Sequence, residues 1–377
     1  MEQITISKDV IIEKPDQQVA RAAKKKWDAI AKPLDGLGKL EDLVCKMAAI
    51  QGTTEVSLEK AAVIAMCADN GIVEEGVTQA GQEVTGIVAV DMAKGIASVC
   101  KMGQAAGIDV IPVDIGISHV AEHENLLKKK VAKGTRNFRK EPAMSKEQMW
   151  QAIQTGADLV WEYSRKGYKI FATGEMGIGN TTTSAAMASA LLHMPVDQVT
   201  GRGAGLSDAG LRRKIEVIRQ ALEKYGLSGE AGSGLTHDGI QDLETVARDQ
   251  SAFAAKVLQC VGGFDIAGLV GVYLGGALYH IPIVLDGMIS TVAALCAEKM
   301  FPGTVEYMIP SHTSKEPAAC KMMEELKLSP MIDGNLSLGE GTGAVLLFPM
   351  LDMALRVYHG NTTFADIQVE QYERYGV

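Results

Sequence analysis

A single carboxylate near the end of the chain stands in the glycine-rich stretch Leu336-Ser-Leu-Gly-Glu-Gly-Thr-Gly-Ala-Val-Leu-Leu-Phe-Pro349. Glu340 lies between Gly339 and Gly341, and an apolar run follows Gly343. Glycines let a backbone approach a ligand closely, so the pattern predicts a tight loop that leads into a buried helix. A carboxylate beside apolar surface is poorly solvated and binds a proton more tightly, which suits a general base. The alternative is a glutamate that simply favours a helix N-terminus.

A second glycine-rich segment, Gly174-Glu-Met-Gly-Ile-Gly-Asn-Thr-Thr-Thr-Ser184, leads into an alanine-rich helical pattern. Free backbone N–H groups at a helix start, with amide and hydroxyl side chains nearby, can cradle a phosphate or carboxylate. The segment lacks the Gly-Lys-Ser/Thr of a P-loop and the Gly-x-Gly-x-x-Gly spacing of dinucleotide binders. It therefore predicts an anion-binding loop, with Gly177, Gly179, Asn180 and Thr181 as candidate ligands.

A third glycine loop, Thr200-Gly-Arg-Gly-Ala-Gly-Leu206, precedes a predicted helix that carries Arg212, Arg213 and Lys214. Ser207 is a suitable N-cap for that helix. The three cations have two interpretations. They form a solvated helix face, or one of them lies near an anion-binding loop and binds phosphate. Candidate contacts for an anionic substrate in this region are Gly203 and Lys214.

Short apolar segments alternate with helical patterns along most of the chain, and this alternation predicts the elements that position the loops. We expect an α/β fold, with a mainly parallel sheet flanked by helices in a Rossmann-like arrangement. The predicted strands are 61–67, 108–113, 168–172, 281–285 and 305–309.

A polar residue follows each of these five segments. Ligands bind at the carboxyl edge of open α/β sheets, so we expect the five side chains to line one crevice of an enzyme that acts on small molecules. Each residue taken singly fits a loop or cap role better than a ligand contact, and it is the shared position after all five segments that favours a common crevice. They are Asp69, Asp114, Glu175, Asp286 and His312.

The bulk composition excludes several classes of protein. With 377 residues, 47% hydrophobic and 22% charged, the chain can fill a large core. A net charge of −9 argues against a nucleic-acid surface and fits a cytoplasmic protein. Six scattered cysteines predict reduced core residues, and His119 and His123 have no third ligand nearby, so we expect no metal site. We expect no signal peptide at Met1 and no membrane span, since the longest apolar run, 266–279, is short and glycine-rich.

Taken together, these segments resemble the nicotinate-nucleotide–dimethylbenzimidazole phosphoribosyltransferases, the CobT family. The matching stretches occur in order along almost the whole chain. They are Lys32-Pro-Leu-Asp-Gly-Leu-Gly-Lys-Leu40, Ala68-Asp-Asn-Gly-Ile72, Glu75-Gly-Val-Thr78, Gly134-Thr-Arg-Asn-Phe138, Pro142-Ala-Met-Ser145, Gly174-Glu-Met-Gly-Ile-Gly-Asn-Thr-Thr182, Thr200-Gly-Arg-Gly203, Val261-Gly-Gly-Phe-Asp-Ile-Ala-Gly268, Leu285-Asp-Gly287, Ser311-His312 and Leu338-Gly-Glu-Gly-Thr-Gly343.

The resemblance implies a homodimer in which residues 1–60 and 350–377 form a small helical domain beside an α/β domain of residues 61–349. It implies transfer of phosphoribose from nicotinate mononucleotide to a benzimidazole-type base, without a cofactor. Glu340 matches the family's general base, Glu175 a second active-site glutamate and Lys214 an active-site lysine. Gln82 lies in the segment where the family places its base-pocket residues.

The chemistry that the resemblance implies needs one base. A benzimidazole loses its N–H proton as its other nitrogen attacks C1′ of the ribose, and the pyridinium leaving group needs no acid. Nearby carboxylates stabilise the positive charge that develops. Two other classes stay open at this point: an NAD(P)-type oxidoreductase, although its glycine fingerprint is missing, and a non-catalytic protein that senses a nucleotide.

Overall fold

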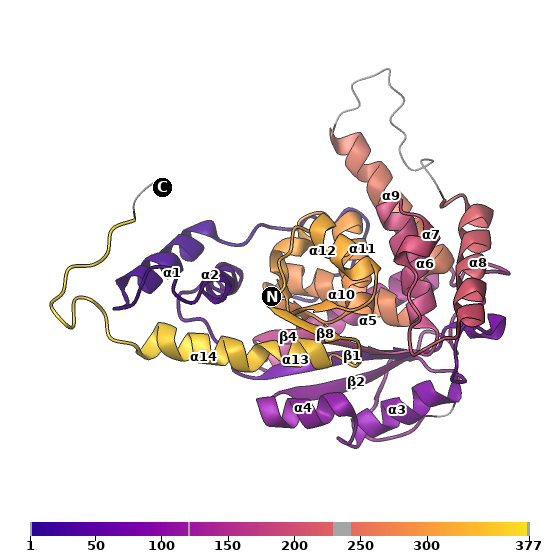
Figure 1. The fold of residues 1–377 in the computed structure, drawn as a ribbon, viewed down its shortest axis with the longest axis horizontal. Coiled ribbons are helices and arrows are strands. Elements are labelled where there is room, and N and C mark those ends of the chain that lie inside the picture. The colour runs from indigo at the N-terminus through magenta and orange to yellow at the C-terminus, as the bar shows by residue number, and fades with distance from the viewer. Residues whose placement is uncertain (1, 120, 229–242, 375–377) are drawn as a thin grey trace.

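The computed structural model describes residues 2–119, 121–228 and 243–374 (Figure 1). Its central sheet has six parallel strands in the order β3-β2-β1-β4-β5-β6. The mainly parallel sheet predicted from the sequence is therefore confirmed. The strands are β1 (Ala61–Ala68), β2 (Asp109–Gly116), β3 (Leu127–Lys128), β4 (Ile170–Met176), β5 (Ile283–Leu285) and β6 (Met308–Pro310).

Strand β1 lies at the middle of the fold, and all eight of its residues are apolar and buried. Such a continuous apolar run is typical of a parallel strand covered on both faces. Alternate residues of β1 belong to two different hydrophobic clusters. Ile64 and Met66 pack with α10 on one face, and Val63 and Cys67 pack with the helices of the other face.

Helices cover both faces of the sheet. One face carries α5 (Lys146–Arg165), α6 (Asn180–Leu192), α9 (Leu243–Val261), α10 (Phe264–Tyr279) and α11 (Met288–Met300). The opposite face carries α3 (Glu83–Ala93), α4 (Ser98–Ala106) and α13 (Thr342–Val345), and the same hydrophobic cluster continues into α14 (Leu347–Gly360), α2 (Lys39–Gln51) and α1 (Gln17–Ala29). The remaining elements are η1 (Gly71–Glu75), α7 (Val196–Val199), α8 (Asp208–Tyr225), η3 (Thr304–Tyr307), α12 (Ala318–Glu325), and the parallel pair β7 (His312–Ser314) and β8 (Ile332–Leu336).

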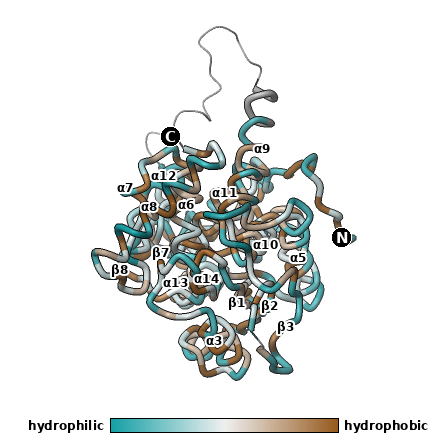
Figure 2. The backbone as a smooth tube through the Cα atoms, turned by 90° about the vertical axis from the view of Figure 1, so that its right-hand side faces the viewer, coloured by the Kyte–Doolittle hydropathy of each residue, from teal (hydrophilic) through white to brown (hydrophobic). Residues whose placement is uncertain are grey.

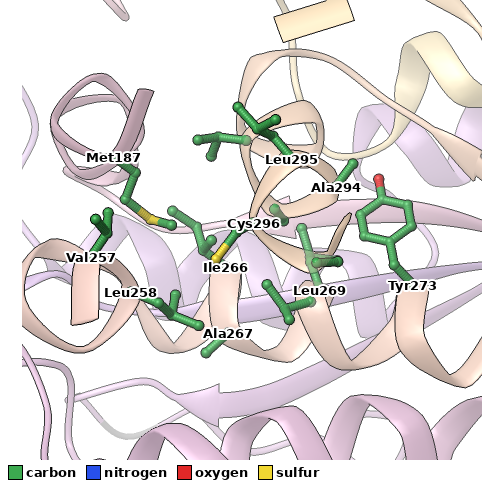
Figure 3. Packing of buried hydrophobic residues seen from close by; sticks show 14 of the residues in the cluster. Met187, Val257, Leu258, Ile266, Ala267, Leu269, Tyr273, Ala294, Leu295 and Cys296 are labelled. Atoms are coloured by element: carbon green, nitrogen blue, oxygen red, sulfur yellow. The ribbon is translucent and has the colours of Figure 1, made fainter. Parts of the chain in front are cut away.

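Helix α10 contains the apolar run 266–279, and nearly all of its residues are buried. Figure 2 places α10 and β1 near the middle of the molecule, and Figure 3 shows Ile266, Leu269 and Tyr273 of α10 among side chains of α6, α9 and α11. Its glycines explain the close contact with α5. A Cβ at Gly271 would lie 1.9 Å from the carbonyl oxygen of Ile153, so only glycine fits.

All five predicted strands differ from the observed ones in their bounds, and three of these differences affect candidate site residues. Strand β4 continues to Met176, so Glu175 belongs to the strand itself. Asp114 likewise lies within β2. The segment 305–309 is mostly the 3-10 helix η3, because only Met308–Pro310 pairs with β5. His312 therefore begins β7, in a separate small sheet.

Helices α1 and α2, near the start of the chain, lie beside α14, near its end (Figure 1). The rings of Trp27 and Tyr358 are 4.9 Å apart, and Ile30 pairs with Thr363. The division into a domain of 1–60 with 350–377 and a domain of 61–349 stays a prediction. The proposed boundary at 349/350 falls inside α14, and one hydrophobic cluster contains residues from both parts.

The cysteines and the helix lengths bear on two further predictions. All six cysteines are free thiols. Cys320 is exposed, so the prediction that it is a core residue is wrong. None of the helices that the structure describes combines the length and the apolar character needed to cross a bilayer.

Candidate active site

A cavity of about 150 Å³ opens at the carboxyl ends of β4 and β5. It collects residues from segments far apart in the chain. Five of the predicted site residues line it: Glu175, Thr181, Gly203, Asp286 and His312. The glycine loop after β8 supplies Gly339, Thr342 and Gly343, and apolar surface comes from Met288, Ile289, Leu336 and Leu338.

Glu175 is buried at the end of β4, and its Oε2 accepts a hydrogen bond from the side-chain amide of Asn180. The same amide donates to Oδ2 of Asp265 at 3.1 Å. Burial, followed by the negative charge of Asp265, raises the pKa of Glu175 to about 8. Burial also raises the pKa of Asp265. The cavity therefore contains a carboxyl group whose charge responds to any cation that enters.

Asp265 was not singled out from the sequence. It is a single carboxylate in the first turn of an otherwise apolar helix, α10, and it is fully buried. That pattern was a usable signal, since a lone charge in a long apolar run needs a partner at a specific place. Asn180 supplies that partner at the first turn of α6.

The predicted anion loop folds as a tight turn at the start of α6. Gly179 has φ +94°, and a Cβ at Gly177 would lie 2.5 Å from the carbonyl oxygen of Ala68. These glycines pack the loop against the end of β1. Of the four residues predicted here as anion ligands, Thr181 lines the cavity, whereas Gly177, Gly179 and Asn180 do not.

Lys214 is a fully buried side chain on α8. Its Nζ donates to Oγ1 of Thr181 at 3.0 Å and to the carbonyl oxygen of Gly201 at 3.1 Å. Burial lowers the pKa of Lys214 to about 8, and the nearby Glu316 opposes that shift. The solvated-face interpretation fits its neighbours Arg212 and Arg213, which are exposed. Lys214 lies beside the cavity wall that Thr181 forms.

The loop that carries Glu340 has an unusual backbone. Gly339, Glu340 and Gly341 have φ values of +88°, +64° and +97°, a region that a non-glycine residue rarely adopts. The Glu340 carboxylate is half-buried and accepts the N–H of Val99 at 3.0 Å. Val99 lies in the first turn of α4, whose N-cap residue Ala97 makes no side-chain hydrogen bond. Glu340 thus caps α4 from a distance, and its side chain does not line the cavity.

His312 and Asp286 meet the same loop from the other side. A Cβ at Gly343 would lie 2.1 Å from Cε1 of His312, so the imidazole rests directly on the glycine backbone. Burial lowers the pKa of His312, and the negative charge of Asp286 partly offsets this. Both side chains are buried.

Two of the five strand-end residues do not reach the cavity, so the prediction of one shared crevice is wrong for them. Asp69 accepts the N–H of Ser118 at 2.7 Å, and Asp114 accepts the N–H of Ile117 at 2.9 Å. Both carboxylates are used to fix the loop that follows β2. Gln82 also lies outside the cavity lining, where its amide donates to the carbonyl oxygen of Asn70.

Within the described ranges, no group of three or more His, Cys, Asp or Glu residues is arranged to hold a metal ion.

Comparison with known proteins identifies the class and then the family. A family model described as a phosphoribosyltransferase matches residues 12–369. The nicotinate-nucleotide–dimethylbenzimidazole phosphoribosyltransferase of Acetivibrio thermocellus is 41% identical over 350 residues, which cover 93% of each chain. The enzyme of the same name from Ruminiclostridium cellulolyticum is 38% identical over 356 residues, 94% of this chain and 95% of that one. The crystal structure of CobT from Thermus thermophilus superposes with a TM-score of 0.82 at 36% identity, covering 94% of this chain and all of that one.

The chain therefore belongs to the nicotinate-nucleotide–dimethylbenzimidazole phosphoribosyltransferase family, which confirms the resemblance found in the sequence.

Proposed function

We propose that this chain transfers the 5-phosphoribosyl group of nicotinate mononucleotide to 5,6-dimethylbenzimidazole or a related base. The products are nicotinate and α-ribazole 5′-phosphate, for the lower ligand of a cobamide. Family membership over almost the whole chain carries this proposal. The test is to incubate the protein with both substrates and to look for nicotinate by chromatography. No release of nicotinate above the rate without protein would overturn it.

The reaction exchanges one C–N bond for another. A nitrogen of the base attacks C1′, the bond from C1′ to the pyridinium nitrogen breaks, and its electron pair neutralises the departing ring. Attack from the opposite face converts the β-nucleotide into an α product. The proton on the other nitrogen of the base must leave, and we propose that Glu340 accepts it. Because Oε2 of Glu340 accepts the N–H of Val99 and the side chain does not line the cavity, this proposal requires the side chain to turn toward the acceptor.

Glu175 has a different role in this proposal. Before the nucleotide binds, its pKa is about 8, so at neutral pH its neutral form prevails. A pyridinium nucleotide brings a positive charge, and an opposite charge nearby favours the carboxylate. The ionised Glu175 then stabilises the oxocarbenium character that develops at C1′.

We propose that the phosphate lies at the end of the cavity formed by Thr181 and Gly203, next to Lys214. Lys214→Ala is expected to raise KM for nicotinate mononucleotide by about 10- to 100-fold, the range for losing one hydrogen bond to a charged group. KM for the base should change far less. Steady-state kinetics with each substrate varied in turn measures both values.

Lys214→Arg is the matched control, because the guanidinium keeps its charge at all working pH values. It should retain more of the nucleotide affinity than Lys214→Ala. An unchanged KM for the nucleotide with a raised KM for the base in Lys214→Ala would place the phosphate elsewhere.

The acceptor pocket is expected to tolerate related flat bases. The cavity offers Met288, Ile289, Leu336 and Leu338 as apolar surface. Removing both methyl groups of dimethylbenzimidazole should weaken binding by about 1–2 kcal/mol, at roughly 0.8 kcal/mol per buried carbon. Benzimidazole should therefore react with a KM raised about 5- to 30-fold, measured by nicotinate release. Complete rejection of benzimidazole would contradict a pocket that binds by apolar area.

We also propose that the chain acts as a homodimer in the cytoplasm, as the family resemblance implies. Light scattering after size-exclusion chromatography tests the oligomeric state, and a mass near 40 kDa would contradict the dimer.

A further inference from the structure

Asp286 directs both oxygens of its carboxylate at one loop. Oδ2 accepts the N–H of Gly341 at 3.2 Å, and Oδ1 accepts the N–H of Ala344 at 3.0 Å. The side chain is 3% exposed. A single carboxylate thus ties together the two ends of the segment 341–344, directly after Glu340.

This loop needs an external restraint. Its three successive positive φ values include one at a non-glycine residue, Glu340, and such a backbone persists only where its surroundings hold it. The loop also packs closely against β4. A Cβ at Gly174 would lie only 2.4 Å from the carbonyl oxygen of Glu340. A Cβ at Gly339 would lie 2.8 Å from Oε1 of Glu175, the next residue of β4. A shift of the loop would therefore displace both glutamates.

Buried hydroxyl groups hold the backbone of Asp286 in place. Its backbone N–H donates to Oγ of Ser290 at 3.0 Å, with Oγ1 of Thr173 at 3.3 Å. Ser290 in turn bonds the hydroxyl of Tyr273 at 2.6 Å. These residues come from β4, α10 and α11 and are at most 1% exposed. The arrangement connects the rigid core to the loop through Asp286.

We propose that Asp286 is a positioning residue that holds the 339–344 loop, and with it Glu340, in place. This differs from its predicted role as a substrate ligand. The kinetic part of the proposal rests on the proposed function, whereas the structural part can be measured without any substrate.

The test is Asp286→Asn, which keeps the shape of the side chain but turns one acceptor into an N–H donor that faces a backbone N–H. Hydrogen exchange in the substrate-free protein should become about 10-fold or more faster at the amides of Gly341 and Ala344. In the same variant kcat should fall about 10- to 100-fold, the range for losing one hydrogen bond to a charged group. KM for nicotinate mononucleotide should change less than about 3-fold.

Ser290→Ala is the milder companion. It removes a hydroxyl that holds the backbone of Asp286 and leaves the carboxylate, so a smaller acceleration at the same two amides is expected. If Asp286→Asn does not fold, hydrogen exchange at these two amides in Ser290→Ala tests the proposal instead. Unchanged exchange at Gly341 and Ala344 would overturn the proposal.

A raised nucleotide KM with normal kcat in Asp286→Asn would also overturn it, because Asp286 would then contact the substrate. So would faster exchange with an unchanged kcat. If the wild-type protein releases no nicotinate, the proposed function is wrong. The hydrogen-exchange rates at Gly341 and Ala344 then test by themselves whether Asp286 holds the loop.

Discussion

Glu340→Gln is expected to lower kcat by about 10²- to 10⁴-fold, the range that general-base catalysis contributes. The amide keeps the size of the carboxylate and one acceptor oxygen but takes up no proton. Single-turnover and steady-state kinetics of the two proteins measure the effect.

The choice of glutamine follows from the contact with α4. The amide oxygen of the glutamine would still accept the N–H of Val99, so the variant should melt close to the wild type, whereas Glu340→Ala removes this cap at a cost of about 1 kcal/mol. Nucleotide binding should persist in Glu340→Gln, because the phosphate is proposed to bind near Lys214. Near-normal kcat in this variant would remove Glu340 from the chemistry, and Glu175 would become the candidate base.

Glu175→Gln is expected to lower kcat/KM for nicotinate mononucleotide by about 10²- to 10³-fold at pH 8.5, the usual effect of removing one electrostatic contact to a transition state. In the wild type this quantity reports the free enzyme, in which the pKa of Glu175 is about 8. The form of Glu175 that stabilises the transition state is the carboxylate, so kcat/KM should rise as the pH increases through about 8. The variant should lack this rise, and the two proteins should differ less at pH 6.

Two controls separate this effect from others. The pKa of Lys214 is also about 8, so loss of its charge should produce a falling limb above that pH, and Lys214→Arg should remove that limb alone. The second control is stability. A buried carboxyl whose pKa is raised from its ordinary value of 4.5 makes the wild type lose stability as pH rises from about 4.5 through 8.

Glu175→Gln should therefore unfold at higher denaturant concentration than the wild type at pH 8, by an amount on the order of a few kcal/mol, and show little difference at pH 4. A rising limb that survives in Glu175→Gln would assign the ionisation to another group. A variant less stable than the wild type at pH 8 would contradict the burial cost assigned to this carboxyl.

The amino-acid sequence predicted the fold class, because apolar runs such as β1 and α10 indicate burial on all sides. It also determined the family, through motifs spread over the whole chain. It marked Glu175, Asp286 and His312 as strand-end residues that share a cavity. These features depend on local composition and spacing, which a linear pattern contains.

Which polar groups contact one another became clear from the three-dimensional packing. The strand-end pattern treated Asp69 and Asp114 like Glu175, but buried polar groups must find hydrogen-bond partners, and both aspartates use theirs on the loop after β2. The same requirement brings the amide of Asn180 to Glu175 and to Asp265, which is 85 residues further along the chain. It also turns the Glu340 side chain toward α4, 241 residues earlier in the chain. Such pairings arise from packing between distant segments, so no local pattern specifies them.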